Sequence, residues 1–141
     1  MKKILLAADG SEHSLKTVNK AIALADPEET EITVLSVMDE DPSMPYAVPQ
    51  DIRDKVKKEK ESFHQETVEN VKDELEKHGL KVKTMVKQGH PAHVICDVAE
   101  SEGYDLIILG SKGMGKIQEF LLGSVSNRVV HCATTNVMIV K

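Results

Sequence analysis

Short apolar runs alternate with helical patterns along the whole chain of 141 residues. This alternation is typical of strand–helix–strand units, which build a parallel sheet with helices packed on both faces. The expected strands are residues 4–8, 31–37, 82–86, 105–109 and 137–140. The expected helices are residues 11–25, 51–78, 91–100 and 124–132. The pattern therefore predicts one α/β domain, 1–141, built on a doubly wound, five-stranded parallel sheet.

Apolar residues at helical spacing indicate which helix faces should be buried. In the first helix these are Leu15, Val18, Ile22 and Ala25. In the long, charged helix 51–78 the stripe is sparser and consists of Ile52, Val56, Phe63, Val71 and Leu75. The strand 82–86 alternates with lysines, which predicts a position at a sheet edge.

Composition narrows the class of protein. Aromatic residues make up 3% of the chain, so the core must be aliphatic, and the net charge of −5 argues against general nucleic-acid binding. No apolar run is long enough to span a membrane, and no secretory signal precedes the first strand. These features favour a cytoplasmic protein, in which Cys96 and Cys132 are expected to be buried, free thiols.

A glycine-rich turn follows the apolar run 105–109 and precedes the helix 124–132. Its pattern is Gly-x2-Gly-x9-Gly-Ser, formed by Gly110, Gly113, Gly123 and Ser124. Glycine lets the backbone approach an anion closely, and a helix amino terminus offers unpaired N–H groups and a positive dipole end. This segment is therefore a candidate phosphate site.

Other phosphate and catalytic motifs fit less well. The P-loop pattern would need Ser or Thr at position 117, which is Ile117, and the dinucleotide pattern would need glycine at position 118, which is Gln118. His90 and His93 lack further ligands nearby in the sequence, so a metal site is disfavoured. No catalytic Ser/His/Asp arrangement or carboxylate pair is evident.

The glycine pattern resembles the nucleotide-binding signature of the universal stress protein family, in its ATP-binding branch. The resemblance extends over the chain and is carried by residues 3–11, 89–95, 110–126 and 136–140. Asn136 stands where the family usually has proline. The resemblance implies strand order 3-2-1-4-5 and a homodimer formed through the last strand, Val137, Met138, Ile139 and Val140. Relatives with this signature bind ATP, so Mg²⁺ or Mn²⁺ is expected to accompany the triphosphate and to be held through the phosphates.

The motifs and the resemblance together predict a site at the ends of the first and fourth strands. The expected nucleotide-contacting residues are Ala7, Ala8, Asp9, Val37, Leu109, Gly110, Lys112, Gly113, Gly123, Ser124, Val125 and Ser126. Asp9 is expected to bind the adenine or ribose, although an N-cap paired with Glu12 is the structural alternative. Ser124 and Ser126 are expected to donate to phosphate, with N-capping as their alternative. Three positive charges lie near the glycine pattern, at Lys112, Lys116 and Arg128. They are suited to binding an anion, and ordinary solvated side chains are the alternative interpretation.

The predicted function is that of an ATP-binding regulatory protein of the universal stress type, in which nucleotide occupancy acts as a switch. Two alternatives stay open at this point. One is a dimeric interaction module that binds nucleotide weakly or not at all, and the other is a slow ATPase. The identity of a protein partner is not indicated by the sequence.

Overall fold

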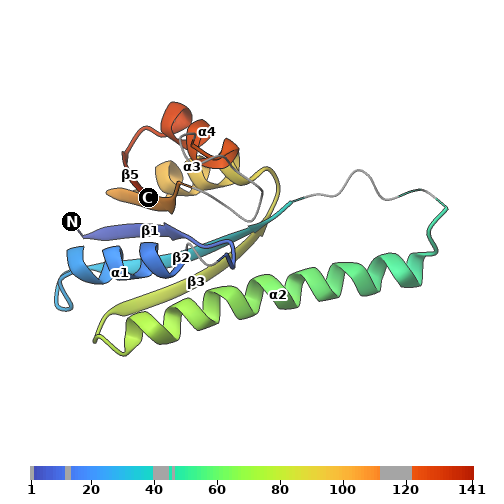
Figure 1. Ribbon diagram of the computed structural model, residues 1–141, viewed down its shortest axis with the longest axis horizontal. Coiled ribbons are helices and arrows are strands. Elements are labelled where there is room, and N and C mark those ends of the chain that lie inside the picture. Colours follow the sequence, from blue (N-terminus) through green and yellow to red (C-terminus); the bar gives the residue numbers. More distant parts are fainter. Residues whose placement is uncertain (1, 12–13, 40–44, 46, 112–121) are drawn as a thin grey trace.

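The computed structural model describes residues 2–11, 14–39, 45, 47–111 and 122–141. Strands and helices alternate through this part of the chain, as the sequence predicts (Figure 1). The elements are, in order, β1 (Lys3–Ala7), α1 (Ser14–Leu24), β2 (Glu31–Met38), α2 (Gln50–Glu76), β3 (Lys81–Gln88), α3 (Pro91–Ser101), β4 (Leu106–Gly110), α4 (Ser124–Cys132) and β5 (Asn136–Val140).

The strands form one five-stranded sheet in the order β3-β2-β1-β4-β5, and every described pair is parallel. The predicted fold class and strand order are therefore confirmed. β1 lies at the centre, with β2 on one side and β4 on the other. β3 lies at an edge, and its exposed residues include Lys81, Lys83 and Lys87, which explains its alternation of lysines with apolar residues.

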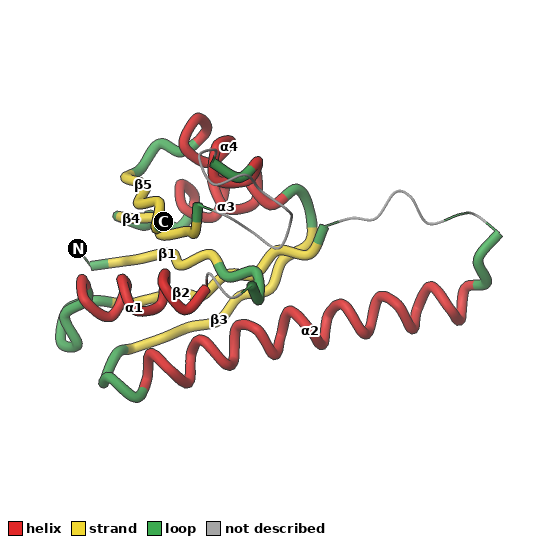
Figure 2. Tube along the Cα trace, in the orientation of Figure 1, coloured by secondary structure: helices red, strands yellow, loops and turns green. Residues whose placement is uncertain are grey.

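Each face of the sheet carries its own apolar core. Ile4 and Leu6 of β1 point into a core shared with α1 and α2, whereas Leu5 points into a core shared with α3 and α4. This division follows from the two-residue period of a strand. Figure 2 shows the two helix pairs on opposite sides of the sheet. Because both faces are covered, β1 and β4 are almost continuously apolar.

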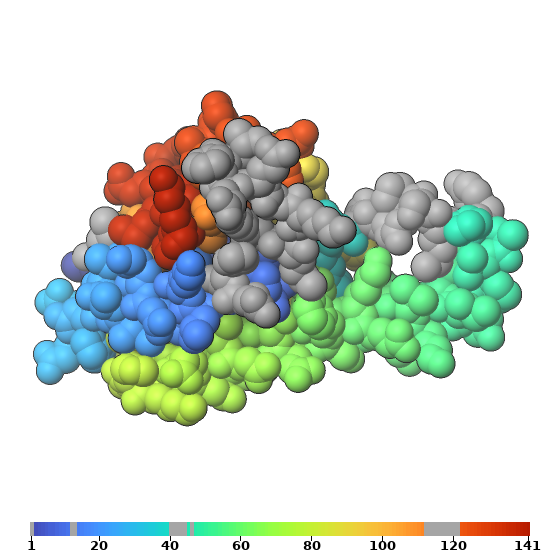
Figure 3. Space-filling view, viewed as in Figure 1, coloured from blue at the N-terminus to red at the C-terminus, as the bar shows by residue number. Residues whose placement is uncertain are grey.

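The long helix α2 is anchored to the sheet mainly through its carboxyl-terminal part. Thr67, Val68, Val71 and Leu75 are buried there, whereas Ile52 is 48% exposed and Phe63 is 42% exposed. The amino-terminal part of α2 projects from the body of the molecule (Figure 3). The apolar stripe of this helix is therefore buried only toward its carboxyl-terminal end, because the helix is longer than the sheet surface beneath it.

A smaller correction applies to α1. Leu15 is 61% exposed, whereas Thr17, Val18 and Ala21 are buried. The buried face is thus centred away from Leu15, because the helix begins at Ser14 and packs on the sheet from its second turn onward. No helix within the described ranges is long and apolar enough to cross a lipid bilayer.

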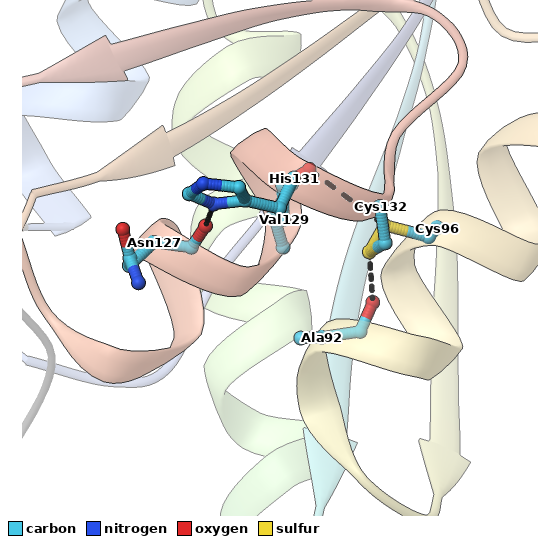
Figure 4. The surroundings of a disulfide bond; sticks show 6 residues. All are labelled: Ala92, Cys96, Asn127, Val129, His131 and Cys132. Carbon is cyan, nitrogen blue, oxygen red and sulfur yellow. Dashed lines mark hydrogen bonds between the residues drawn. A yellow bond between two sulfur atoms is a disulfide. The ribbon is translucent and has the colours of Figure 1, made fainter.

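Cys96 of α3 and Cys132 of α4 form a disulfide, with Cα atoms 6.3 Å apart (Figure 4). The prediction of free thiols is therefore wrong for this structure. The two residues are 36 positions apart in sequence. Their proximity arises because α3 and α4 pack side by side on one face of the sheet, which residue spacing alone does not reveal.

A polar contact joins α2 to the carboxyl-terminal part of β2. The hydroxyl oxygen of Ser36, which is 1% exposed, lies 2.6 Å from Nδ1 of His64. Burial of the imidazole lowers the pKa of His64, an effect that Lys60 reinforces and Asp39 opposes. The neutral form of His64 is therefore favoured by the fold.

The uneven anchoring of α2 is tested by two truncations on the same helix. Leu75→Ala removes a fully buried side chain and should lower the free energy of unfolding by about 2–5 kcal/mol. Ile52→Ala removes a half-exposed side chain and should change it by no more than about 0.5 kcal/mol. Urea denaturation measures both values. Equal losses in the two variants would contradict the proposed division of α2.

The burial of His64 makes stability depend on pH. Since folding lowers the pKa of His64, the unfolded chain binds a proton first as the pH drops. Stability linked to His64 is thus present above about pH 6.5 and is lost below it, by at most about 1.4 kcal/mol per pH unit. Urea denaturation between pH 7 and pH 5 should show a shallower decline for His64→Gln than for the wild type. His131→Gln, at an exposed histidine, is the control and should keep the wild-type decline.

Candidate functional site

The strand order of the sheet reverses between β1 and β4. The chain builds β2 and β3 outward on one side of β1, and then returns to place β4 and β5 on the other side. Leu6 of β1 pairs with Ile108 of β4. Ala7 and Gly110 therefore end neighbouring strands at the carboxyl-terminal edge of the sheet, hereafter the edge. Loops that leave such neighbouring strands in opposite directions open a crevice, where ligands of open α/β sheets bind.

The start of α4 is held against the end of β4. The N–H group of Gly123 donates a 2.7 Å hydrogen bond to the carbonyl oxygen of Ser111. The hydroxyl of Ser126 is within hydrogen-bond distance of the carbonyl oxygens of Ser111, at 3.3 Å, and Gly123, at 3.1 Å. Ser111 and Ser126 are both buried. These contacts fix the helix terminus at the carboxyl-terminal end of β4.

The first turn of α4 presents backbone N–H groups to this edge. Gly123 is the N-cap residue, and among the described residues no side chain caps the helix. Helix geometry leaves the N–H groups of Ser124, Val125 and Ser126 without partners inside the helix. They carry the positive end of the helix dipole, which favours a bound anion. Ser124 is exposed, so this end of α4 is accessible.

The turn after β1 lies at the same edge of the sheet. Oδ1 of Asp9 accepts hydrogen bonds from the N–H group of Ser11, at 2.9 Å, and from the hydroxyl of Ser14, at 3.3 Å. Because α1 begins at Ser14, Asp9 lies too far upstream to be its N-cap residue. Among the described residues both contacts use Oδ1, and Oδ2 accepts none. Asp9 is half-buried and thus remains accessible at this edge.

Gly10 has a conformational role in this turn. Its φ is +81°, a left-handed value that glycine adopts without the steric cost of a side chain. A Cβ atom here would lie 2.7 Å from Cζ of Phe63 in α2. The turn that carries Asp9 therefore packs closely on the long helix.

The remaining predicted residues are distributed between the edge and the core. Ala7 and Val37 are half-buried at the carboxyl-terminal ends of β1 and β2. Ala8 is 6% exposed and packs into the core under α1 and α2, and Leu109 is 4% exposed and packs into the core under α3 and α4. The side chains of Ala8 and Leu109 thus pack in the core and do not face the candidate site. Lys112, Gly113 and Lys116 lie outside the described residues.

Two features of this region are absent from the predicted set of site residues. Ser111 holds the start of α4 through its carbonyl oxygen, a backbone role that no side-chain motif signals. Arg128 of α4 places Nη1 2.8 Å from Nε2 of His90, the N-cap residue of α3. A guanidinium only donates hydrogen bonds, so Nε2 of His90 is the acceptor in this contact.

The rings of His90 and His93 lie 4.8 Å apart, edge to face. Within the described part of the chain, no three His, Cys, Asp or Glu side chains are grouped as metal ligands. The chemistry that the described edge offers is therefore anion binding by backbone N–H groups, with a carboxylate acceptor nearby at Asp9.

Known proteins resemble this chain in sequence and in fold. Universal stress protein YxiE of Bacillus subtilis (strain 168) is 32% identical over 145 residues, which cover 99% of this chain and 98% of that protein. The solved structure of MJ0577, a universal stress protein of Methanocaldococcus jannaschii, superposes with a TM-score of 0.85 at 33% identity and covers 99% of this chain and 95% of that one. A universal stress protein family structure from Arabidopsis thaliana with AMP bound has a TM-score of 0.75 and 21% identity, covering 100% and 92%, and shows likeness of fold alone.

The sequence profile of the universal stress protein family matches residues 1–141. This match covers the sheet, both helix layers and the glycine pattern together. The predicted family resemblance is therefore confirmed, and the chain belongs to the universal stress protein family.

Proposed function

We propose that this protein binds an adenine nucleotide, ATP in particular, in the crevice between β1 and β4. The observation that carries the proposal is the meeting of two anion- and ribose-binding elements at one edge. The uncapped amino terminus of α4 is held there by Ser111, and Asp9 follows the neighbouring strand. Each element is ordinary by itself, but together they offer donors for phosphate and an acceptor for a hydroxyl or amino group.

The triphosphate is assigned to the glycine pattern and the first turn of α4. Gly110 and Gly123 flank the connection between β4 and α4, and the N–H groups of Ser124, Val125 and Ser126 are the proposed phosphate donors. The buried hydroxyl of Ser126 is engaged with backbone carbonyls, so its proposed contribution is through its N–H group. Lys112 and Gly113 are kept in the proposal on the strength of the sequence pattern.

The base and ribose are assigned to the ends of β1 and β2. Asp9 is the proposed acceptor for a ribose hydroxyl or the adenine amino group, through Oδ2. Ala7 and Ala8 leave room for a flat ring at the end of β1, and Val37 supplies backbone groups at the end of β2. Leu109 packs in the core beneath the proposed base site. The AMP-bound relative of this fold supports an adenine nucleotide as the ligand class.

Mg²⁺ or Mn²⁺ is proposed to accompany ATP. Such ions commonly keep several waters and bind through substrate phosphates. The α4 terminus fits a metal–triphosphate held mainly through its phosphates. When bound, the ion would neutralise phosphate charge, while the residues of this chain position the nucleotide.

We infer a regulatory role in the cytoplasm, with nucleotide occupancy acting as a switch in a stress response. Bound phosphate adds contacts at the start of α4 beyond the bonds to Ser111, and so changes a surface that another protein reads. The alternative of an ATPase is distinguished by phosphate release under multiple turnover. Repeated turnover approaching the ~10 s⁻¹ of a typical enzyme supports the ATPase, and bound ATP that is recovered intact supports the switch.

We also propose a homodimer through β5. In the sheet order β5 has a described neighbour, β4, on one side only. Its residues Val137, Met138, Ile139 and Val140 are half-buried and apolar. An apolar edge strand is prone to pairing, and a twofold pairing with a second copy closes the assembly.

The phosphate site is tested by one charge at the start of α4. Ser124→Asp adds an anion to the first helical turn, where it should stabilise the free helix by about 0.3–1 kcal/mol. The same charge should repel the triphosphate and weaken ATP binding by at least about tenfold. Isothermal calorimetry with ATP and Mg²⁺ measures the affinity. Retained thermal stability shows that any loss is not caused by unfolding.

Ser124→Asn is the matched control, because it has nearly the same size as Ser124→Asp without the charge. It should keep an affinity within about threefold of the wild type, a difference under 1 kcal/mol. Equal affinities for the Asp and Asn variants would contradict phosphate binding at α4. Absence of binding by the wild type would favour the interaction-module alternative.

The dimer is tested by a backbone substitution. Val140 accepts a hydrogen bond from Ser111 on the β4 side, so the backbone groups of Ile139 point to the outer edge. Ile139→Pro removes an outward N–H group, which edge strands tolerate, and should shift the protein towards monomer in light scattering. Ile139→Ala truncates the side chain but keeps the N–H group, and should remain more dimeric. A monomeric wild type at micromolar concentration would refute the dimer.

A further inference from the structure

The disulfide between Cys96 and Cys132 has one buried and one accessible end. Cys96 is 8% exposed and belongs to the core under α3 and α4, whereas Cys132, the last residue of α4, is exposed. Thiol–disulfide exchange requires a thiolate to reach a sulfur atom, so access decides which sulfur is attacked. The exposed Cys132 is therefore the entry point to this bond.

The surroundings of the two sulfur atoms also suit the reduced state. Sγ of Cys96 lies 3.9 Å from the carbonyl oxygen of Val129 in α4, and Sγ of Cys132 lies 3.7 Å from that of Ala92 in α3 (Figure 4). A disulfide sulfur carries no proton, but a thiol is a weak donor. After reduction each thiol has an acceptor on the opposite helix. The pair can thus open without leaving buried polar groups unpaired.

Within the described residues, α4 contacts the body of the molecule through a small buried face, an Arg128–His90 contact and its two ends. Of its nine residues, Ser126 and Val129 are buried. Its amino terminus is joined to the end of β4 by the bonds to Ser111, and its last residue is joined to α3 by the disulfide. The disulfide is the covalent restraint on the carboxyl-terminal end of α4 and adds to these noncovalent contacts.

We propose that Cys96–Cys132 is a thiol–disulfide exchange site, entered at Cys132 by low-molecular-weight thiols and disulfides, that controls how firmly α4 is held. In opening, an external thiolate attacks Cys132, forms a mixed disulfide there and releases Cys96 as a thiolate, which takes a proton. A second external thiolate then attacks the sulfur of the attached small thiol, forms the oxidised small disulfide and releases Cys132. The protein gains two electrons and two protons.

In closing, the Cys132 thiolate attacks an oxidised small disulfide and expels one thiolate. Cys96, once deprotonated, then attacks Cys132 in the mixed disulfide and expels the second thiolate. Each step exchanges one S–S bond for another, and the small disulfide is the oxidant.

This site bears on ligand binding because α4 carries the proposed phosphate-binding terminus, and that consequence rests on the proposed function. The disulfide lies at one end of α4 and the N–H groups of Ser124–Ser126 lie at the other. A helix that moves as a whole transmits restraint along its length. The oxidised form should therefore hold the N–H groups in a fixed position and bind ATP about fivefold or more tightly than the reduced form.

The entry point is tested with single-cysteine variants and oxidised glutathione as the probe. In Cys96→Ala the exposed Cys132 should gain one glutathione adduct, detected by intact-protein mass spectrometry. In Cys132→Ser the buried Cys96 should stay unmodified over the same time. Faster modification of Cys96 than of Cys132 would overturn the assignment of the entry point.

The restraint is tested on the wild-type protein, oxidised by glutathione disulfide or reduced by dithiothreitol. Amide hydrogen exchange at residues 127–132 should be about tenfold faster in the reduced form, since local opening governs exchange. The double variant Cys96→Ala/Cys132→Ser should exchange alike under both conditions. Equal exchange in the two wild-type forms would refute the control of α4.

Calorimetry with ATP on the same two forms separates the two proposals. Tighter binding by the oxidised form supports the link between the exchange site and the nucleotide site, and equal, measurable binding refutes that link. If neither form binds ATP, the proposed function fails. The adduct and hydrogen-exchange results then still decide whether the exchange site exists and restrains α4.

Discussion

The placement of β1 between β2 and β4 is the constraint on which the rest of this structure depends. Ile4, Leu5 and Leu6 are fully buried because the strand has a neighbour on each side and a helix layer on each face. Burying three aliphatic side chains stabilises the fold by about 1.5–3 kcal/mol each. Since the chain leaves β1 towards one edge and returns on the other, the strand ends of β1 and β4 become the place where connections diverge.

The start of α4 illustrates how a weakly buried helix acquires a defined position. Two donors, the N–H of Gly123 and the hydroxyl of Ser126, converge on the carbonyl oxygen of Ser111. A buried carbonyl must find hydrogen-bond donors, so this pairing locates the helix terminus relative to the sheet. At the other end Cys132 is tied to α3. The helix is therefore positioned by specific bonds at its two ends together with the contacts of Val125, Arg128 and Val129 along it.

The two helix layers differ in how they meet the sheet. α2 contributes Val68, Val71 and Leu75 to one core and then extends beyond the sheet, where Ile52 is exposed. On the other face α3 is buried along much of its length, with Ala92, Ile95, Val98 and Ala99 in the core. The candidate site lies at the carboxyl-terminal end of the sheet, between the two helix layers. The turn carrying Asp9 contacts α2 at Gly10, and the glycine pattern leads to α4.

The sequence by itself determined the strands, the helices, the parallel sheet and the glycine pattern, because these depend on local periodicity, on turn chemistry and on recurring family motifs. It also marked Asp9 and Ser124, since both follow recognisable strand or helix boundaries. Tertiary structure alone decided that Leu15 and Ile52 are exposed, that Ser111 anchors α4, and that Cys96 meets Cys132. The physical reason is that exposure, backbone carbonyl pairing and sulfur–sulfur contact depend on which surfaces meet in space, and segments far apart in the chain carry no local signal of their meeting.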